Sequence, residues 1–225
     1  MQLDFQAREV TVKLVYYGPA LSGKTTNLQA IHRLLTPEGK GRLMTLETRD
    51  DRTLFFDLLP LTVNTETGLT VRIKLFTVPG QVIHNSTRRL VLQGADGVAF
   101  IADSQVQEVR ANQASFKDLR KNLRENGIDP AVMPLVIQYN KRDLPNIRSE
   151  EEIMRMASQG KERIYLATAT HGAGVADTFM GLIGATWENM ERQHQLKERF
   201  GLNEQSMMHD LRKRFGAPVE ATKHG

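Results

Sequence analysis

The chain has 225 residues, of which 40% are hydrophobic, so it can bury a substantial core, and we expect one domain followed by a tail. Its 30 basic and 26 acidic residues leave a net charge of +4, which is too small to indicate a nucleic-acid partner. The chain contains no cysteine, and this excludes disulfides, thiolate metal sites, prenylation and palmitoylation.

Neither export nor membrane insertion is expected from the sequence. Residues 1–6 contain no basic region followed by an apolar stretch, and residue 2 is glutamine, so we expect neither a signal peptide nor myristoylation. No apolar run approaches the ~20 residues that a helix needs to cross a bilayer. The expected location is therefore the cytoplasm.

Short apolar strands alternate with amphipathic helices, a pattern typical of a doubly wound α/β sheet. The first predicted strand covers residues 10–17, and a helix follows over 25–35. Strands over 53–60 and 71–78 flank a polar turn at 64–68, which predicts an antiparallel hairpin. The further expected elements are buried strands over 97–102, 134–139 and 164–167 and helices around 110–125, around 150–157 and from 175 past 187. The prediction is an α/β fold with a six-stranded, mostly parallel sheet, one antiparallel strand and helices on both faces.

A phosphate-binding loop joins the first strand to the first helix. Residues 18–25 read G-P-A-L-S-G-K-T, which fits the G-x-x-x-x-G-K-T pattern whose backbone N–H groups cradle nucleotide phosphates at a helix N-terminus. Lys24 is expected to reach the β- and γ-phosphates, and Thr25 to place its hydroxyl on Mg²⁺. The residues predicted to bind the nucleotide here are Gly18, Leu21, Ser22, Gly23, Lys24, Thr25 and Thr26.

The metal side of the predicted site departs from the usual pattern. P-loop NTPases hold Mg²⁺ with a second carboxylate at the end of an apolar strand, but residues 77–81 read T-V-P-G-Q, without an aspartate. Gly80 can still offer its N–H to the γ-phosphate, and Gln81 stands where a glutamine would position water. Asp103 ends the next strand and could be a metal ligand, but a helix cap or loop residue is the favoured interpretation. Mg²⁺ would then be held by Thr25, phosphate oxygens, waters and a threonine from the loop before the second strand.

That loop, residues 37–53, is basic and rich in turn residues. A threonine beside arginines suits a segment that closes on the γ-phosphate. Arg52 would neutralise charge that develops in the transition state, an effect worth on the order of 10³–10⁵ in rate. A solvated polar loop is an equally good interpretation of Arg52 from the residues alone.

The base side is predicted from N-K-R-D at residues 140–143, directly after a buried strand. Asp143 can accept hydrogen bonds from guanine N1–H and the 2-amino group, and a buried carboxylate there would reject adenine. Asn140 can tie this loop to the phosphate loop, and the stem of Lys141 can lie over the base. Ala169 offers a backbone N–H to the base O6. The residues predicted to bind the base are Asn140, Lys141, Asp143, Thr168, Ala169 and Thr170.

With these motifs the chain resembles a Ras-like small GTPase and, more narrowly, the bacterial gliding-motility and cell-polarity GTPases of the MglA type. The resemblance covers about residues 5–187, and the T-V-P-G-Q segment is itself typical of this group. The segments that carry it are 15–19, 21–28, 52–57, 77–82 and 136–143.

The resemblance implies roles for three further residues. Thr53 would be the switch threonine linked to Mg²⁺, Arg52 an arginine finger supplied by the same chain, and Gln81 the residue that orients water. It also implies slow GTP hydrolysis to GDP, stimulated by a roadblock-fold partner, and GTP-dependent recruitment of polarity or motility effectors, with the active form at a cell pole. Thr170 departs from the lysine that many small GTPases carry at this position.

Two alternatives to an active switch remain at this point. The first is a regulatory module that binds the nucleotide with little or no turnover, since Thr77 replaces a carboxylate. The second is a P-loop ATPase or nucleotide kinase, against which Asp143 argues. The presence of both Gln81 and Arg52 favours the active switch.

Beyond a GTPase domain expected over residues 1–187, we expect a helical extension over 188–225. It comprises helical stretches over 187–200 and about 204–215, separated by Gly201, and residues 217–225 are expected to be disordered. Apolar residues recur at helical spacing in the second stretch, which allows an interfacial helix for a membrane or partner. Basic and acidic residues nearly balance here, so attraction to anionic lipid would be weak. A helix packed on its own domain, or a partner-binding segment, is the favoured interpretation.

Overall fold

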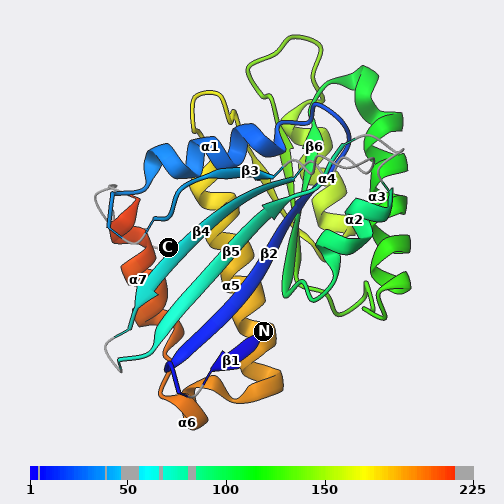
Figure 1. Cartoon of the computed structure of the whole chain (residues 1–225). Helices are drawn as coiled ribbons and strands as arrows, with labels where there is room; N and C mark the ends of the chain where they lie inside the picture. Colours follow the sequence, from blue (N-terminus) through cyan, green and yellow to red (C-terminus); the bar gives the residue numbers. More distant parts are fainter. Residues whose placement is uncertain (5, 39, 47–55, 66–67, 81–84, 216–225) are drawn as a thin grey trace.

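A mixed sheet forms the centre of the molecule (Figure 1). The computed structural model describes residues 1–4, 6–38, 40–46, 56–65, 68–80 and 85–215. Within these ranges the sheet has eight strands in the order β3-β4-β5-β2-β6-β7-β8, with β1 paired to β2. The strands are β1 (Gln2–Asp4), β2 (Glu9–Tyr17), β3 (Met44–Leu46), β4 (Phe56–Asn64), β5 (Thr70–Thr77), β6 (Gly97–Asp103), β7 (Leu135–Asn140) and β8 (Arg163–Leu166).

Strand direction divides the sheet into a parallel part and an antiparallel edge. β5, β2, β6, β7 and β8 run parallel to one another, whereas β4 is antiparallel to both β5 and β3. All seven residues of β6 are buried, as expected for a parallel strand covered on both faces. The parallel strands therefore all end at the same edge of the sheet, where the loops of the predicted site follow them.

Helices cover both faces of the sheet (Figure 1), as predicted. The helices are α1 (Lys24–Leu34), α2 (Asn85–Leu92), the short 3₁₀ helix η2 (Val106–Glu108), α3 (Val109–Glu125), α4 (Glu150–Gln159), α5 (Val175–His194), α6 (Leu196–Phe200) and α7 (Glu204–Arg214). α1, α5 and α7 pack into one apolar cluster with β2, β4 and β5. α2 and α3 contribute to a second cluster that includes Val98 and Phe100 of β6.

The predicted strand count of six was too low. The expected strands correspond to β2 and β4 to β8, but β1 and β3 were missed because each has only three residues, too few to show an alternating pattern. The short helix α2 was not predicted either. The end of β4 was placed too early at Pro60: the strand continues to Asn64 because its last four residues pair with β5. The Pro60 carbonyl accepts a hydrogen bond from the Gly41 N–H at 2.8 Å. The expected start of that strand, at residues 53–55, lies outside the described residues.

The C-terminal helices pack against the rest of the chain. The first predicted stretch is divided at Gln195, whose φ of 51° ends α5 and begins α6, and Gly201 precedes α7 as expected. Met207 and Leu211 of α7 are buried in the first apolar cluster. The Phe215 ring lies 5.7 Å from that of Phe179 on α5. Of the two favoured interpretations of this segment, packing on its own domain is thus confirmed for α7.

Two further points concern the extension and the membrane. The disorder expected for residues 217–225 falls on a segment outside the described residues. Across the described part of the chain, no helix combines the length and the apolar character needed to cross a membrane.

Candidate nucleotide-binding site

The phosphate loop lies between the end of β2 and the start of α1, and close packing requires glycine at both of its ends. Gly18 has a φ of 153°, and a Cβ there would lie 2.2 Å from the Ile101 carbonyl oxygen of β6. Gly23 caps α1 with a φ of 94°, and its Cβ would lie 2.2 Å from the side-chain nitrogen of Asn140. Leu21 also has a positive φ, 60°, and its side chain is exposed.

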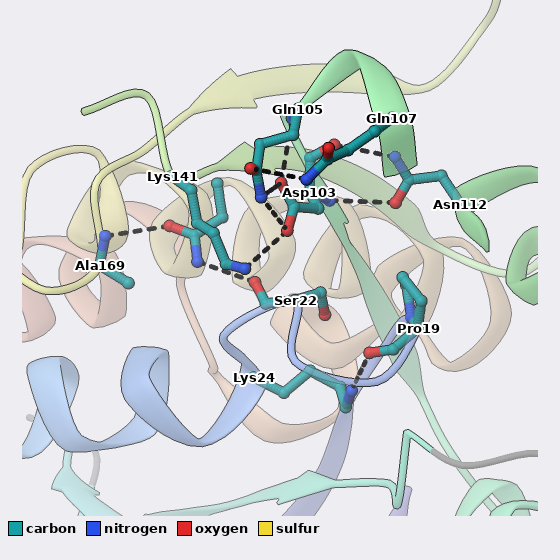
Figure 2. A network of polar contacts seen from close by, with 10 residues as sticks. Pro19, Ser22, Lys24, Asp103, Gln105, Gln107, Asn112, Lys141 and Ala169 are labelled. Atoms are coloured by element: carbon teal, nitrogen blue, oxygen red, sulfur yellow. Dashed lines mark hydrogen bonds and ion pairs between the residues drawn. The ribbon is translucent and has the colours of Figure 1, made fainter. Parts of the chain in front are cut away.

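Lys24 is buried over the loop that precedes it. Its Nζ donates to the carbonyl oxygen of Gly18 at 3.1 Å. It also donates to the carbonyl oxygen of Pro19 at 2.6 Å (Figure 2). Burial, followed by the charge of Arg88, lowers the pKa of Lys24 to about 7, although the charge of Asp57 opposes both effects. The ammonium group therefore lies where an anion would stabilise it.

Asp57 of β4 supplies a carboxylate to the metal side of the site. Its Oδ2 accepts hydrogen bonds from the hydroxyls of Thr25 at 2.6 Å and Thr77 at 2.9 Å, and its Oδ1 accepts one from Thr45 at 2.9 Å. The side chain is buried. The carboxylate that is absent from position 77 is thus present on the neighbouring antiparallel strand.

Thr77 suits this arrangement. Its hydroxyl donates to the Asp57 carboxylate and accepts a hydrogen bond from the Asp57 N–H at 2.9 Å. An aspartate at position 77 would place a second carboxylate against the first, and like charges at that distance disfavour ionisation of both. The T-V-P-G-Q segment is therefore compatible with an intact metal site.

The oxygen atoms of Asp57 and of its neighbour Thr25 suit the binding of Mg²⁺. This ion prefers oxygen ligands, and it is usually held by one or two protein groups together with phosphates and water. The Thr25 hydroxyl and the Asp57 carboxylate provide such a pair. Among the described residues, no three or more His, Cys, Asp or Glu side chains lie together in a group that could hold a metal ion.

Some of the residues that we expect to take part in hydrolysis or to bind Mg²⁺ lie outside the described residues. Arg52, Thr53 and Gln81 all lie outside the described residues, so their expected roles stay predictions. Gly80 is described: a Cβ on it would lie 2.3 Å from Cα of Ala20, so its backbone packs directly on the phosphate loop. Gly80 lines a cavity of about 480 Å³ together with Lys24, Thr25 and Asp57.

Asn140 joins the base side to the phosphate side. Its Nδ2 donates to the Ser22 carbonyl at 2.9 Å, and its Oδ1 accepts from the Ala169 N–H at 3.0 Å. The link between the two loops was predicted. The Ala169 N–H, however, is already engaged by Asn140, so a contact with the base O6 would have to share it.

A cavity of about 170 Å³ lies beside Asn140 and is lined in part by Thr26, Asp143, Ala169 and Thr170. Asp143 is exposed and lies in the turn that follows β7, at the rim of this cavity, where a bound base would cover it. Thr168 does not line the cavity; its N–H donates to the Ala173 carbonyl and closes the loop before α5.

Asp103 was expected to be a helix cap or a loop residue, but it is the last residue of β6, and its carboxylate contacts residues that follow β6 and β7. Its Oδ2 accepts from Nζ of Lys141 at 2.6 Å, and its Oδ1 accepts from the Gln105 N–H at 3.0 Å (Figure 2). Lys141 itself has a φ of 67°. Asp103 therefore anchors the lysine of the N-K-x-D motif rather than a metal, a pairing that the sequence analysis did not predict.

Asp57 is the functional residue that the sequence analysis missed. Inward and outward positions alternate along β4, and Asp57 occupies the same inward phase as Leu59, Leu61 and Val63. A carboxylate in the buried phase of an apolar strand needs partners, and this was the available signal.

Comparison with known proteins agrees with this geometry. No family model matches the chain. It is 49% identical over 176 residues to the mutual gliding-motility protein MglA of Myxococcus xanthus (strain DK1622), and the match covers 78% of this chain and 90% of that protein. Together with the phosphate loop and the α/β sheet that carries it, this similarity shows that the chain belongs to the MglA family of Ras-like small GTPases.

Proposed function

We propose that the chain is a GTP-binding molecular switch that hydrolyses GTP slowly alone and faster with a roadblock-fold partner. The observation that carries the proposal is the position of Asn140. It bonds Ser22 of the phosphate loop and Ala169 of the base side at once. The phosphate and base subsites are thereby held at a fixed spacing, as recognition of one nucleotide requires.

Guanine selectivity is assigned to Asp143. The carboxylate lies at the rim of the cavity beside Asn140, and a bound guanine would cover it and donate two hydrogen bonds to it. Adenine would leave the same carboxylate covered and unpaired, which is unfavourable. Lys141, fixed by Asp103, places its apolar stem at the same cavity.

On the phosphate side, Lys24 exchanges the carbonyls of Gly18 and Pro19 for phosphate oxygens. Thr25 and Asp57 hold Mg²⁺, which supplies charge neutralisation for the phosphates when bound. Thr53 is proposed as a further ligand. These assignments rest on the contacts of Lys24 and Asp57 and, for Thr53, on the family pattern.

Turnover is assigned to Gln81, which would orient the attacking water, and to Arg52, which would neutralise the transition state. The proposed partner places both residues, and this would make hydrolysis slow in its absence. The relative in Myxococcus xanthus is named for gliding motility, which supports a role in surface motility or cell polarity. We further propose that the protein is cytoplasmic, that its GTP-bound form is recruited to a cell pole, and that this form recruits the effectors.

The alternative is a module that binds GTP or GDP with little or no turnover. That alternative was raised because position 77 has no carboxylate. The Asp57 carboxylate, which accepts a hydrogen bond from Thr25, argues against it. Single-turnover phosphate release distinguishes the two: no release with the cognate roadblock protein present would favour the binding module.

Competition between nucleotides tests the assignment of the base. A fluorescent GTP analogue bound to the wild type should be displaced by GTP at concentrations ~100-fold or more below those of ATP, because the site is built to pair with guanine donors. Asp143→Ala should lose most of this preference. Glu198→Ala, an exposed carboxylate on α6, serves as the control and should keep it. An undiminished GTP preference in Asp143→Ala would refute the base assignment.

A further inference from the structure

Arg88 of α2 is buried and lies beside the candidate site without belonging to any motif used above. Its exposed fraction is 1%, and it is the largest of the fully buried side chains in the described part of the chain. Arginine is almost never fully buried unless its guanidinium is paired. Its partners therefore indicate why it is there.

The guanidinium divides its hydrogen bonds between backbone and carboxylate. Nε donates to the Pro79 carbonyl at 2.9 Å, and Nη2 donates to the Gly80 carbonyl. On its other side, Nη1 donates to Oδ2 of Asp118 on α3 at 2.6 Å. Arg88 thus links the loop after β5 to α3.

A second layer of side chains fixes this pair. The Tyr17 ring lies 5.7 Å from the guanidinium, and its hydroxyl donates to the Asp118 carboxylate. Asn122 of α3 donates to the Tyr17 hydroxyl at 3.0 Å. The position of Arg88 is therefore determined by β2 and α3, which are independent of the loop that it holds.

The carbonyl contacts determine the direction of a neighbouring N–H. In a trans peptide the C=O and the following N–H point in opposite directions, and no cis peptide occurs among the described residues. Because Arg88 holds the Pro79 C=O, the Gly80 N–H of the same peptide points away from the Arg88 guanidinium. Gly80 packs on Ala20 and lines the cavity that Lys24 also lines.

We propose that Arg88 is a positioning residue for recognition of the γ-phosphate: it holds the Pro79–Gly80 backbone so that the Gly80 N–H faces the end of the phosphate chain. The inference rests on the proposed function. Arg88 acts through the backbone and does not touch the nucleotide. The same carbonyl contacts fix the backbone that leads into Gln81.

The competing explanation is that Arg88 only anchors α2. The two explanations differ in how they treat GTP and GDP. The γ-phosphate is present in GTP alone, so loss of a group that orients a γ-phosphate contact weakens GTP binding and leaves GDP binding intact. A general loss of packing weakens both nucleotides together.

The test measures the dissociation constants of fluorescent GDP and of a non-hydrolysable fluorescent GTP analogue for the full chain. Arg88→Met should weaken GTP-analogue binding by roughly tenfold while GDP binding changes by less than about twofold, as expected for loss of one oriented hydrogen bond. Arg89→Met is the matched control. Arg89 is the next residue on α2, its side chain is 53% exposed, and it contacts Glu125. Both constants should be unchanged in it.

Arg88→Lys covers the case in which the methionine variant does not fold. Lysine keeps the charge beside Asp118 but cannot reproduce the planar fork that holds two carbonyls and a carboxylate. Circular dichroism and thermal melting establish folding, and the same selective loss of GTP binding is expected. Equal losses for GTP and GDP, or none, in a folded variant would overturn the role of Arg88.

This result can be separated from the proposed function itself. A wild type that binds neither guanine nucleotide would refute the proposed function. A wild type that binds both, together with an Arg88→Lys variant of unchanged GTP-to-GDP ratio, would refute the inference alone.

Discussion

Asp57 and Thr77 face each other on the antiparallel strands β4 and β5, and the Thr77 hydroxyl donates to Oδ2 of Asp57 at 2.9 Å. The same oxygen accepts from the Thr25 hydroxyl. The usual pattern requires a carboxylate at position 77 on β5. In this chain the carboxylate is instead at position 57, on β4, directly opposite Thr77.

Replacement of Asp57 by asparagine should weaken Mg²⁺-dependent GTP binding by on the order of 10- to 100-fold, the range typical when a group that supports a metal site is lost. The amide keeps the size of the side chain but removes its charge. Titration of GTP binding against Mg²⁺ measures the effect, and binding at high EDTA serves as the reference. An unchanged dependence on Mg²⁺ would show that Asp57 is only a structural partner of Thr25.

Thr77→Asp should destabilise the protein in the absence of Mg²⁺, because it places two carboxylates together. Repulsion raises the pKa of such a pair above its value in the unfolded chain, so the stability is greatest at low pH and is lost as the pH rises through the raised pKa. Thermal melting between pH 4 and pH 8 measures this. The exchange Asp57→Thr with Thr77→Asp restores a single carboxylate and should recover most of the stability. If Thr77→Asp melts like the wild type at every pH, the two positions do not interact as described.

GTP binding should take up a proton at about pH 8. Burial first, and the charge of Arg88 second, lower the pKa of Lys24 to about 7, and phosphate oxygens would raise it again. The free protein above this pKa has lost a proton that the complex needs, so affinity falls as the pH rises. Calorimetry in two buffers of different ionisation enthalpy measures the uptake. Lys24→Arg, whose side chain stays charged, should show none, and identical enthalpies for the wild type in both buffers would contradict the prediction.

Gln81→Leu and Arg52→Ala should each lose most of the hydrolysis that we propose a roadblock-fold partner stimulates, while GTP binding is retained. Removal of an arginine finger costs on the order of 10³–10⁵ in rate in related chemistry. Single-turnover phosphate release with and without the partner gives the rates, and fluorescent GTP binding gives the control. A normal stimulated rate in either variant would exclude the role assigned to that residue.

Leu211→Ala should lower the free energy of unfolding by about 2–5 kcal/mol, since it removes a buried side chain from the apolar cluster. Lys213→Ala on the exposed side of α7 is the matched control and should change it by less than about 0.5 kcal/mol. Denaturant unfolding measures both. Equal effects would mean that α7 is not part of the cooperative unit.

The parts of the site that lie within a short stretch of sequence could be predicted, and those formed by pairing across strands could not. The phosphate loop is specified by residues 18–25 and their flanking elements, and the role of Asn140 follows from the N-K-x-D motif. Asp57 acquires its role only because β4 runs antiparallel beside β5. The pairing of Asp103 with Lys141 likewise depends on the neighbouring ends of β6 and β7.

The fold, like the site, could be predicted where a short stretch of sequence specifies it and not where it depends on pairing between strands. Strands that show an apolar run or an alternation of inward and outward residues were identified, whereas the three-residue strands β1 and β3 are defined only by pairing with β2 and β4. The predicted strand ended at Pro60, but β4 continues to Asn64. Proline lacks only the N–H, and the Pro60 carbonyl still accepts a hydrogen bond, from the Gly41 N–H.

The close approach of Gly23 to Asn140 makes the two nucleotide-binding motifs sterically dependent on each other. Any side chain at position 23 would displace the Asn140 amide, which lies 2.2 Å from the Cβ position. A substitution in the phosphate loop would thus be felt at the base, through the loss of the bonds from Asn140 to Ser22 and Ala169. The motifs stand far apart in the sequence, yet neither can be mutated or transplanted as a separate module.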